Sequence, residues 1–133
     1  MKALSVRQPW AELILLGRKT VETRTWRTAH RGPFAIHAAF QVEIEVCTLY
    51  GLDPTSLVTS ALVGTAEIIE MIEFDTESWA TWRDQHLVPD PDPGGRVGWR
   101  LANPRRLAQP IPLRGLPGLF PLEDKIAARI AYE

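Results

Sequence analysis

Between Gly17 and Trp26, the sequence concentrates side chains that can bind a charged ligand with a flat ring. Lys19 and Arg24 are cations, Glu22 is a carboxylate, and Trp26 contributes an indole. Lysine and arginine contact phosphates, and a carboxylate accepts a hydrogen bond from the exocyclic amine of a base such as cytosine. An indole can stack on a base for about 1–3 kcal/mol. We therefore predict a site for an anionic, flat-ringed ligand, and nucleic acid is the first candidate.

The same residues could also carry out catalysis. Burial lowers the pKa of a lysine, so a desolvated Lys19 could act as a general base while Glu22 positions or activates water. The alternative is that Lys19 is an ordinary surface lysine that balances a helix dipole. Glu22 and Arg24 could simply pair with each other, but a surface ion pair is worth only about 0–1 kcal/mol. Lys19 and Glu22 are therefore the catalytic candidates if the protein is an enzyme.

Residues outside this segment could complete a nucleic-acid site. They share a side chain that can donate to phosphate or stack on a base, and they are Gln8, Trp10, Arg31, His37, Arg100 and Arg105. Free N–H groups at the start of a helix near Gln8 and Trp10 could also hold an anion. A place in the core is the alternative for Trp10 and Trp26. His37 has small neighbours along its strand, so we expect it on a shallow, accessible surface.

Charge is distributed unevenly along the chain, although the formal net charge is only −1. Residues 1–32 carry seven bases and two acids, residues 40–93 carry one base and eleven acids, and residues 94–114 carry five bases and no acid. Folding could bring the two basic segments together as one positive face, and charges scattered over the surface are the alternative. Arginine outnumbers lysine, which favours bidentate contacts with phosphates or base edges.

Length and composition favour one domain spanning residues 1–133. No apolar run approaches the roughly 20 residues needed to cross a bilayer, and the first residues lack a hydrophobic signal region. We therefore expect a cytoplasmic protein without a membrane partner. Cys47 is the only cysteine, and its apolar helical surroundings predict a buried structural thiol. His30, His37 and His86 lack the spacing of metal ligands, so we predict no metal and no cofactor.

Hydrophobic periodicity and turn residues divide the chain into short elements. Strands are expected at residues 2–7, 20–26, 34–39, 62–74 and 97–101, followed by an edge or irregular strand at 105–113. Helices are expected at residues 8–17, 41–50, 77–86 and 123–132, with Gly17 as a left-handed stop and Thr76 as a cap. Gly64 predicts a bend, and Asn103-Pro104 predicts a break. The pattern indicates an α+β fold: a small mixed barrel of five to six strands with short flanking helices.

Positions 17, 19, 22 and 24 give the pattern Gly-x-Lys-x-x-Glu-x-Arg, placed where a helix stops and a strand begins. Together with the lead-in Leu4–Trp10 and the segment Trp99–Arg105, this pattern resembles the activating signal cointegrator homology (ASCH) domain, a branch of the PUA-like superfamily. The resemblance implies a PUA-like barrel with a cleft over residues 17–24. It also implies binding of RNA or DNA in that cleft.

The resemblance implies two enzymatic activities as well. One compact bacterial branch of the family removes the acetyl group of N4-acetylcytidine, using a lysine, a threonine three residues later and a more distant glutamate. Lys19 matches the lysine, whereas Glu22 stands at the threonine position. A further member type is a ribonuclease, which implies lysine-assisted cleavage of a phosphodiester.

Three hypotheses follow. In the first, the chain is a single ASCH domain that binds RNA or single-stranded nucleic acid, which could carry a modified nucleoside. In the second, it hydrolyses N4-acetylcytidine or RNA phosphodiesters with Lys19 as the base. In the third, a helix carrying Trp79 and Trp82, together with the acidic middle of the chain, binds an unknown protein partner.

Overall fold

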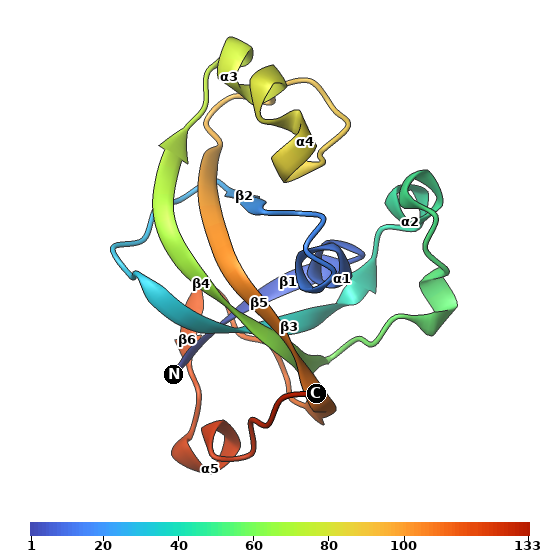
Figure 1. Ribbon diagram of the computed structural model, residues 1–133, viewed down its shortest axis with the longest axis vertical. Coiled ribbons are helices and arrows are strands. Elements are labelled where there is room, and N and C mark those ends of the chain that lie inside the picture. The colour runs from blue at the N-terminus through green and yellow to red at the C-terminus, as the bar shows by residue number, and fades with distance from the viewer.

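The computed structural model describes residues 1–133 as an α+β fold of six strands and five short helices (Figure 1). The strands are β1 (Lys2–Gln8), β2 (Val21–Arg24), β3 (Gly32–Val42), β4 (Ala61–Glu73), β5 (Val97–Pro112) and β6 (Leu119–Pro121). The helices are α1 (Trp10–Leu15), α2 (Ile44–Tyr50), α3 (Thr76–Thr81), α4 (Arg83–His86) and α5 (Asp124–Ala127), with a 3₁₀ turn at Pro54–Ser56. The α+β class predicted from the sequence is confirmed.

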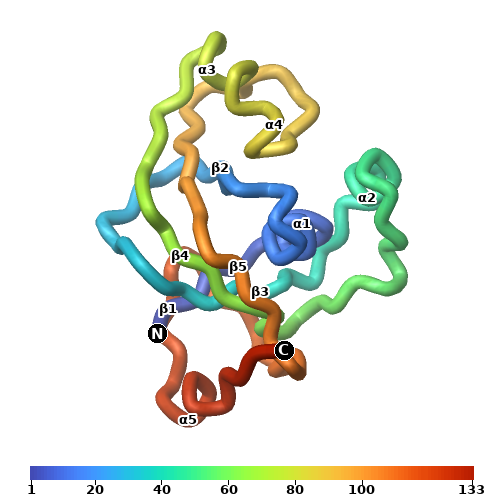
Figure 2. Tube along the Cα trace, in the orientation of Figure 1, coloured from blue at the N-terminus to red at the C-terminus, as the bar shows by residue number.

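All six strands belong to one mixed sheet in the order β2-β5-β4-β3-β1-β6. β1 and β3 are parallel, and every other neighbouring pair is antiparallel. The sheet is strongly curled, but β2 and β6 remain its two edges, so hydrogen bonds do not close it into a barrel (Figure 1). Both termini lie at the end of the molecule opposite α3 and α4 (Figure 2).

The core occupies both faces of the central strands. Phe34 and Ile36 of β3 belong to a cluster of 12 buried residues that α1 covers through Ile14. Ala35, on the other face of β3, belongs to a second cluster of 7 residues that packs beside α5. Successive residues of a strand point to opposite faces, so this part of β3 has no exposed side. The expectation of an accessible His37 is therefore wrong, because its ring is only 2% exposed.

Helix α1 ends in the turn that leads into β2. Leu13 and Ile14 of α1 are buried, whereas Leu16, directly after the helix, is 47% exposed. Gly17 has φ of +78°, which is the left-handed geometry predicted for the helix stop. The amides of the residues at 18 and 19 then both donate to the carbonyl of Leu13 at 3.0 Å. These bonds reverse the chain and bring Lys19 back under α1.

Strand β5 is longer than the sequence predicts. It continues through Asn103 and Pro104 to Pro112, so the expected break does not end the strand. The two residues instead fall in a shift of register against β4, where Asn103 takes a φ of +51°. Proline has no N–H to donate, so a strand tolerates it where one side lacks a partner. β2 pairs only with the segment of β5 that ends at Arg100, which leaves that side free of β2 where Pro104 lies.

The long pairing of β4 with β5 is bent by shifts in register. One shift lies at Gly64, where an added Cβ atom would be 2.6 Å from the carbonyl oxygen of Arg105. A side chain would therefore collide with the neighbouring backbone, which only glycine avoids. The bend predicted at Gly64 is confirmed.

Two helices occupy the segment expected as one helix at residues 77–86. α3 and α4 meet at Trp82, and Asp75, not Thr76, is the cap of α3. The Asp75 carboxylate accepts a hydrogen bond from the amide of Ser78 at 2.8 Å, and the Ser78 hydroxyl accepts one from the Asp75 amide at 2.9 Å. Leu87 follows with φ of +65°, and residues 88–96 lead back to β5.

Helix α2 ends at a left-handed glycine, with φ of +72° at Gly51. Cys47 is fully buried in this helix, and burial raises the pKa of its thiol. A raised pKa keeps the thiol in its less reactive protonated form, which agrees with the predicted structural role. The structure contains no helix with the length and apolar character needed to cross a membrane.

Candidate functional site

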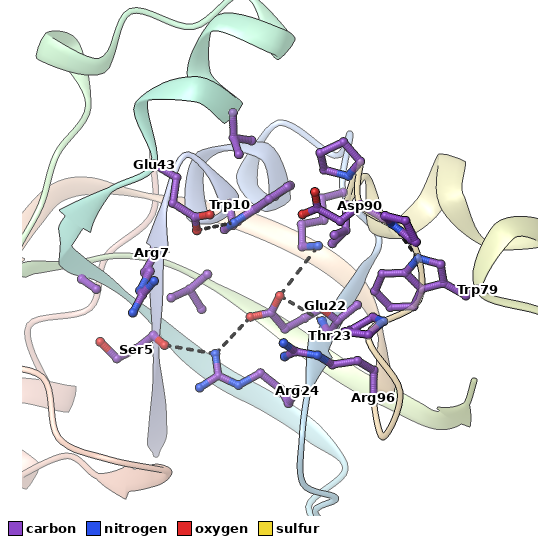
Figure 3. Close-up of a pocket in the computed structure, with 18 residues that line it drawn as sticks. Ser5, Arg7, Trp10, Glu22, Thr23, Arg24, Glu43, Trp79, Asp90 and Arg96 are labelled. Carbon is purple, nitrogen blue, oxygen red and sulfur yellow. Dashed lines mark hydrogen bonds and ion pairs between the residues drawn. The ribbon is translucent and has the colours of Figure 1, made fainter. Parts of the chain in front are cut away.

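A cavity of about 540 Å³ lies beside the edge strand β2 (Figure 3). β1, the first residue of α1, the residue before α2 and the chain that follows α4 all contribute to its walls. The charged and aromatic side chains that line it are Arg7, Trp10, Lys19, Glu22, Arg24, Glu43, Trp79, Asp90 and Arg96. Figure 3 shows Glu22 near the centre, between Trp10 on one side and Arg24 and Arg96 on the other.

Lys19 is buried against the cavity, with only 2% of its surface exposed. Its Nζ donates to the carbonyl oxygen of His86 at 2.5 Å and lies 4.6 Å from the centre of the Trp10 ring. Burial lowers the pKa of this ammonium from 10.5 to about 8, and the nearby carboxylates of Glu22 and Glu43 oppose the shift. Lys19 is therefore mostly charged at neutral pH but loses its proton far more easily than a surface lysine.

Glu22 connects two cations at the floor of the cavity. Its Oε1 is 3.7 Å from Lys19 Nζ and accepts from the Thr23 amide at 3.0 Å, while its Oε2 accepts from Arg24 Nη1 at 3.2 Å. The Glu22 side chain is 7% exposed and that of Arg24 is 25% exposed. Glu22 and Arg24 therefore do not form an isolated surface ion pair but belong to a largely buried cluster with Lys19. Removing one charge from this cluster would leave the opposite charge buried without a partner.

Trp10 forms one wall of the cavity. Its Nε1 donates to Glu43 Oε2 at 2.7 Å, and its ring also packs against the main core cluster. Lys19 lies against the same ring, so the indole contacts a cation and a carboxylate at once. Core packing and cavity lining, which were alternatives for this residue, are combined in the structure.

Trp79 lines the opposite wall, and His86 stacks on it with ring centres 4.1 Å apart. His86 Nε2 lies 2.8 Å from the Trp79 carbonyl oxygen, and its Nδ1 accepts from the Val88 amide at 3.0 Å. These partners require a neutral ring with its proton on Nε2. Burial, the largest cause, lowers the His86 pKa, which favours the same neutral form.

This pair also fixes the chain that closes the cavity. Trp79 Nε1 donates to the carbonyl oxygen of Asp90 at 3.0 Å, and Arg83 donates to the same oxygen at 3.2 Å. Trp79 is only 2% exposed, so it is not part of a surface that a protein partner could contact. Of the two tryptophans expected to contact a protein partner, Trp79 is therefore not accessible for such a contact.

Both basic segments recognised in the sequence reach the cavity. Arg7 comes from the first and Arg96 from the second, and neither forms an ion pair in the structure. With Lys19 and Arg24 they make four bases, against the three acids Glu22, Glu43 and Asp90 in the same lining. The cavity is therefore close to neutral in total charge. It offers both guanidinium groups, a chemistry that binds phosphate, and carboxylates, which accept hydrogen bonds.

Gln8 does not line the cavity. Its side chain is buried, its Nε2 donates to the Val58 carbonyl at 2.8 Å, and its Oε1 accepts from the Glu12 amide at 3.0 Å. The Glu12 amide at the start of α1 is not free to bind an anion as expected, because it already donates a hydrogen bond to the Gln8 side chain. Gln8 instead connects α1 to the chain before β4.

Four other predicted contact residues lie outside the cavity. Trp26 packs edge-on against Trp99, with ring centres 4.8 Å apart. Arg100 pairs with Glu70 at 2.8 Å. Arg105 stacks over the Tyr132 ring at 3.5 Å, and Arg31 donates to the Thr28 carbonyl at 2.8 Å. The cavity therefore gathers Trp10, Lys19, Glu22 and Arg24 from the predicted set and none of these four.

His37 is held in a chain of hydrogen bonds. Its Nε2 donates to the Leu113 carbonyl at 2.6 Å, which leaves Nδ1 to accept from the Ser5 hydroxyl at 2.8 Å. Gly115 covers the ring so closely that an added Cβ atom would lie 2.7 Å from it. His37 therefore joins β1 and β3 to the chain after β5.

Several lining residues were not predicted from the sequence. They are Ser5, Arg7, Glu43, Trp79, Asp90 and Arg96. Arg7 and Arg96 could have been considered, because each belongs to a basic segment and stands at or beside the end of an expected strand. Glu43 and Asp90 carry no local signal, since only the path of the chain brings them to β2.

Comparison with known proteins identifies a family model and relatives that match most of the chain. The family model described as "ASCH domain" matches residues 4–112. The human and mouse proteins called Activating signal cointegrator 1 are each 27% identical over 135 residues, covering 92% of this chain and 22% of their own length. The chain thus spans about a fifth of those relatives.

A solved structure shares the fold. The crystal structure of ASCH from Zymomonas mobilis superposes with a TM-score of 0.70 at 15% identity, covering 96% of this chain and 90% of that one. At this identity the likeness shows the fold alone. It supports the curled, six-stranded sheet described above.

Proposed function

Because this chain belongs to the ASCH domain family, we propose that it binds RNA or another single-stranded nucleic acid with one base held in the cavity beside β2. RNA binding is proposed for this PUA-like family as a whole. The observation that carries the proposal here is the buried Lys19–Glu22–Arg24 cluster on the cavity floor. A volume of about 540 Å³ is in the range of small-molecule sites, and it suits a single unstacked nucleotide.

The carboxylate of Glu22 is the proposed reader of the base. Each of its oxygens accepts one hydrogen bond, from the Thr23 amide and from Arg24, and each retains acceptor capacity. A carboxylate in this position suits an exocyclic amine such as cytosine N4. Trp10 offers an aromatic face in the same cavity, against which a base can stack.

Arg7 and Arg96 are the proposed phosphate contacts. Both line the cavity without an acidic partner, so they can bind phosphate oxygens without first breaking an ion pair. Arg7 is exposed and Arg96 is half-buried, which places them where a nucleic-acid backbone can reach. Their contribution should be electrostatic and hence sensitive to salt.

A binding titration tests this proposal. Fluorescence anisotropy with a labelled single-stranded RNA should show affinity that falls steeply with salt, and Arg96→Gln should reduce the slope of log K against log salt by about 1. Arg27→Gln is the matched control, because Arg27 pairs with Glu73 and does not line the cavity. Binding that ignores salt, or equal effects of both variants, would rule the cavity out as the phosphate site.

One observation favours hydrolysis as a second candidate function: the Lys19 pKa of about 8. A lysine with a pKa near the operating pH can serve as a general base. Neutral Lys19 would take a proton from water positioned by Glu22, and the hydroxide formed would attack the acyl carbonyl of N4-acetylcytidine. The proton then passes to the leaving amine, which releases cytidine and acetate.

Direct assay separates the two candidates. The protein is incubated with N4-acetylcytidine and with a short single-stranded RNA, and the products are resolved by chromatography. Hydrolysis predicts turnover that Lys19→Ala abolishes and that rises as the pH approaches 8. If neither substrate is consumed by the wild type, the hydrolytic proposal is wrong and the binding proposal stands alone.

A further inference from the structure

A second hollow, of about 430 Å³, adjoins the first cavity at the paired strands β1 and β3. Ser5 and Ala39 line both hollows, so the two are neighbours that share a short wall. Both shared side chains are small, so little side-chain bulk stands between the two hollows. The remaining contributors to the second hollow include Phe40, Arg114 and Leu116.

Phe40 is the most unusual of these residues. It is 80% exposed at the end of β3, although an aromatic side chain normally buries most of its surface. Its ring forms none of the aromatic pairs found between the other rings of the protein. An open aromatic face at the rim of a hollow is available to a ligand.

The charge of the second hollow differs from that of the first. No acidic residue lines it, and its one cation, Arg114, is exposed and forms no ion pair. Arg7, also without an ion pair, lines the first cavity and stands two residues after the shared Ser5 in β1. An exposed ring with two free guanidinium groups suits a base and its phosphates.

The wall of the second hollow is preformed. The hydrogen bonds from Ser5 to His37 and from His37 to Leu113 hold it together. Gly115 packs against His37 and Ser5 with no room for a side chain. A ligand would therefore not need to order this wall when it binds.

We propose that the second hollow is a subsite for the nucleotide adjacent to the one held in the first cavity, with Phe40 stacking on its base and Arg114 and Arg7 contacting phosphates. This inference rests on the proposed function. It specifies the ligand further: a single-stranded RNA of at least two nucleotides, bound across Ser5 and Ala39, in place of a free nucleoside. The shared lining and the absence of acidic groups favour RNA over a peptide or a second copy of the chain.

The test compares a short RNA with single nucleotides. A labelled single-stranded RNA hexamer and the four ribonucleoside monophosphates are titrated against the wild type and three variants. Phe40→Ala should weaken hexamer binding by about 5- to 150-fold and leave binding of the monophosphates unchanged. Phe40→Trp should restore hexamer binding, and Ile69→Ala, which removes an exposed apolar side chain outside both hollows, should change neither.

The outcomes distinguish this inference from the function on which it rests. If the wild type binds neither RNA nor nucleotides, both are wrong. If it binds the hexamer and Phe40→Ala binds it equally well, the subsite is wrong and the first cavity stands. Equal weakening of hexamer and monophosphates would also overturn a separate subsite. A second copy of the chain would cover the Phe40 ring if the wild type were a dimer in sedimentation and Phe40→Ala a monomer. That result would also overturn the subsite.

Discussion

The ammonium of Lys19 lies 3.7 Å from a carboxylate oxygen of Glu22, and both side chains are almost completely buried. Two charges removed from water are each costly, and their mutual attraction offsets that cost only while both are present. The backbone carbonyl of His86 and the guanidinium of Arg24 complete the arrangement. Stability and ligand recognition are therefore coupled at this point of the fold.

Glu22→Gln should destabilise the protein strongly. The substitution removes the counter-charge of a buried ammonium, and breaking a buried pair of this kind typically costs about 3–5 kcal/mol. Urea unfolding at pH 7 measures the loss. Glu70→Gln is the matched control, because Glu70 and Arg100 are both 48% exposed and such a pair is worth at most about 1 kcal/mol. Equal losses in the two variants would contradict the buried-pair interpretation.

The stability of the wild type relative to Lys19→Met should rise between pH 8 and pH 10.5. In this window the unfolded chain binds the lysine proton and the folded protein does not, because the folded pKa is about 8 and the unfolded pKa is 10.5. Stability rises with pH wherever the unfolded state binds more protons, which gives about 3 kcal/mol over the window. Urea unfolding of both proteins at several pH values measures the difference. A difference that stays constant from pH 8 to pH 10.5 would show that Lys19 is not desolvated.

Acid should begin to destabilise the protein through His86 as the pH falls below 6.5. The His86 pKa is lowered in the folded state, so below pH 6.5 the unfolded chain takes up a proton that the folded ring refuses. The stabilisation is present above pH 6.5 and is lost as the pH falls towards the folded pKa. His86→Asn should flatten the dependence of unfolding free energy on pH in this range. An unchanged slope in His86→Asn would show that this ring does not cause the loss of stability in acid.

Gly64→Ala should cost more stability than Gly17→Ala. At Gly64 the new Cβ atom would lie 2.6 Å from a backbone oxygen of β5, so the β4–β5 bend must shift, at a typical cost of about 1–3 kcal/mol. At Gly17 the space is open and only the positive φ is unfavourable, which costs about 1 kcal/mol. Thermal unfolding of the two variants ranks them. The reverse ranking would mean that the β4–β5 bend relaxes easily.

The sequence determined the local parts of the site. Gly17 ends α1 because only a residue without a Cβ atom takes a positive φ at little cost. The strand that follows places Lys19, Glu22 and Arg24 within six residues of one another, and the structure keeps these three together in one cluster. Hydrophobic periodicity and turn preferences depend on residues that are close in sequence, so they can be recognised without the tertiary structure.

Only the tertiary structure decided what surrounds these residues. Burial of Glu22 and Lys19 depends on α4 and on the chain after it, which lie more than sixty residues further along the sequence. Burial on both faces of β3 converted His37 from an expected surface residue into a structural one. β5 likewise runs past Pro104 because its pairing with β4 outweighs a local breaker. Desolvation depends on everything that packs around a group, and this cannot be read from its neighbours in sequence.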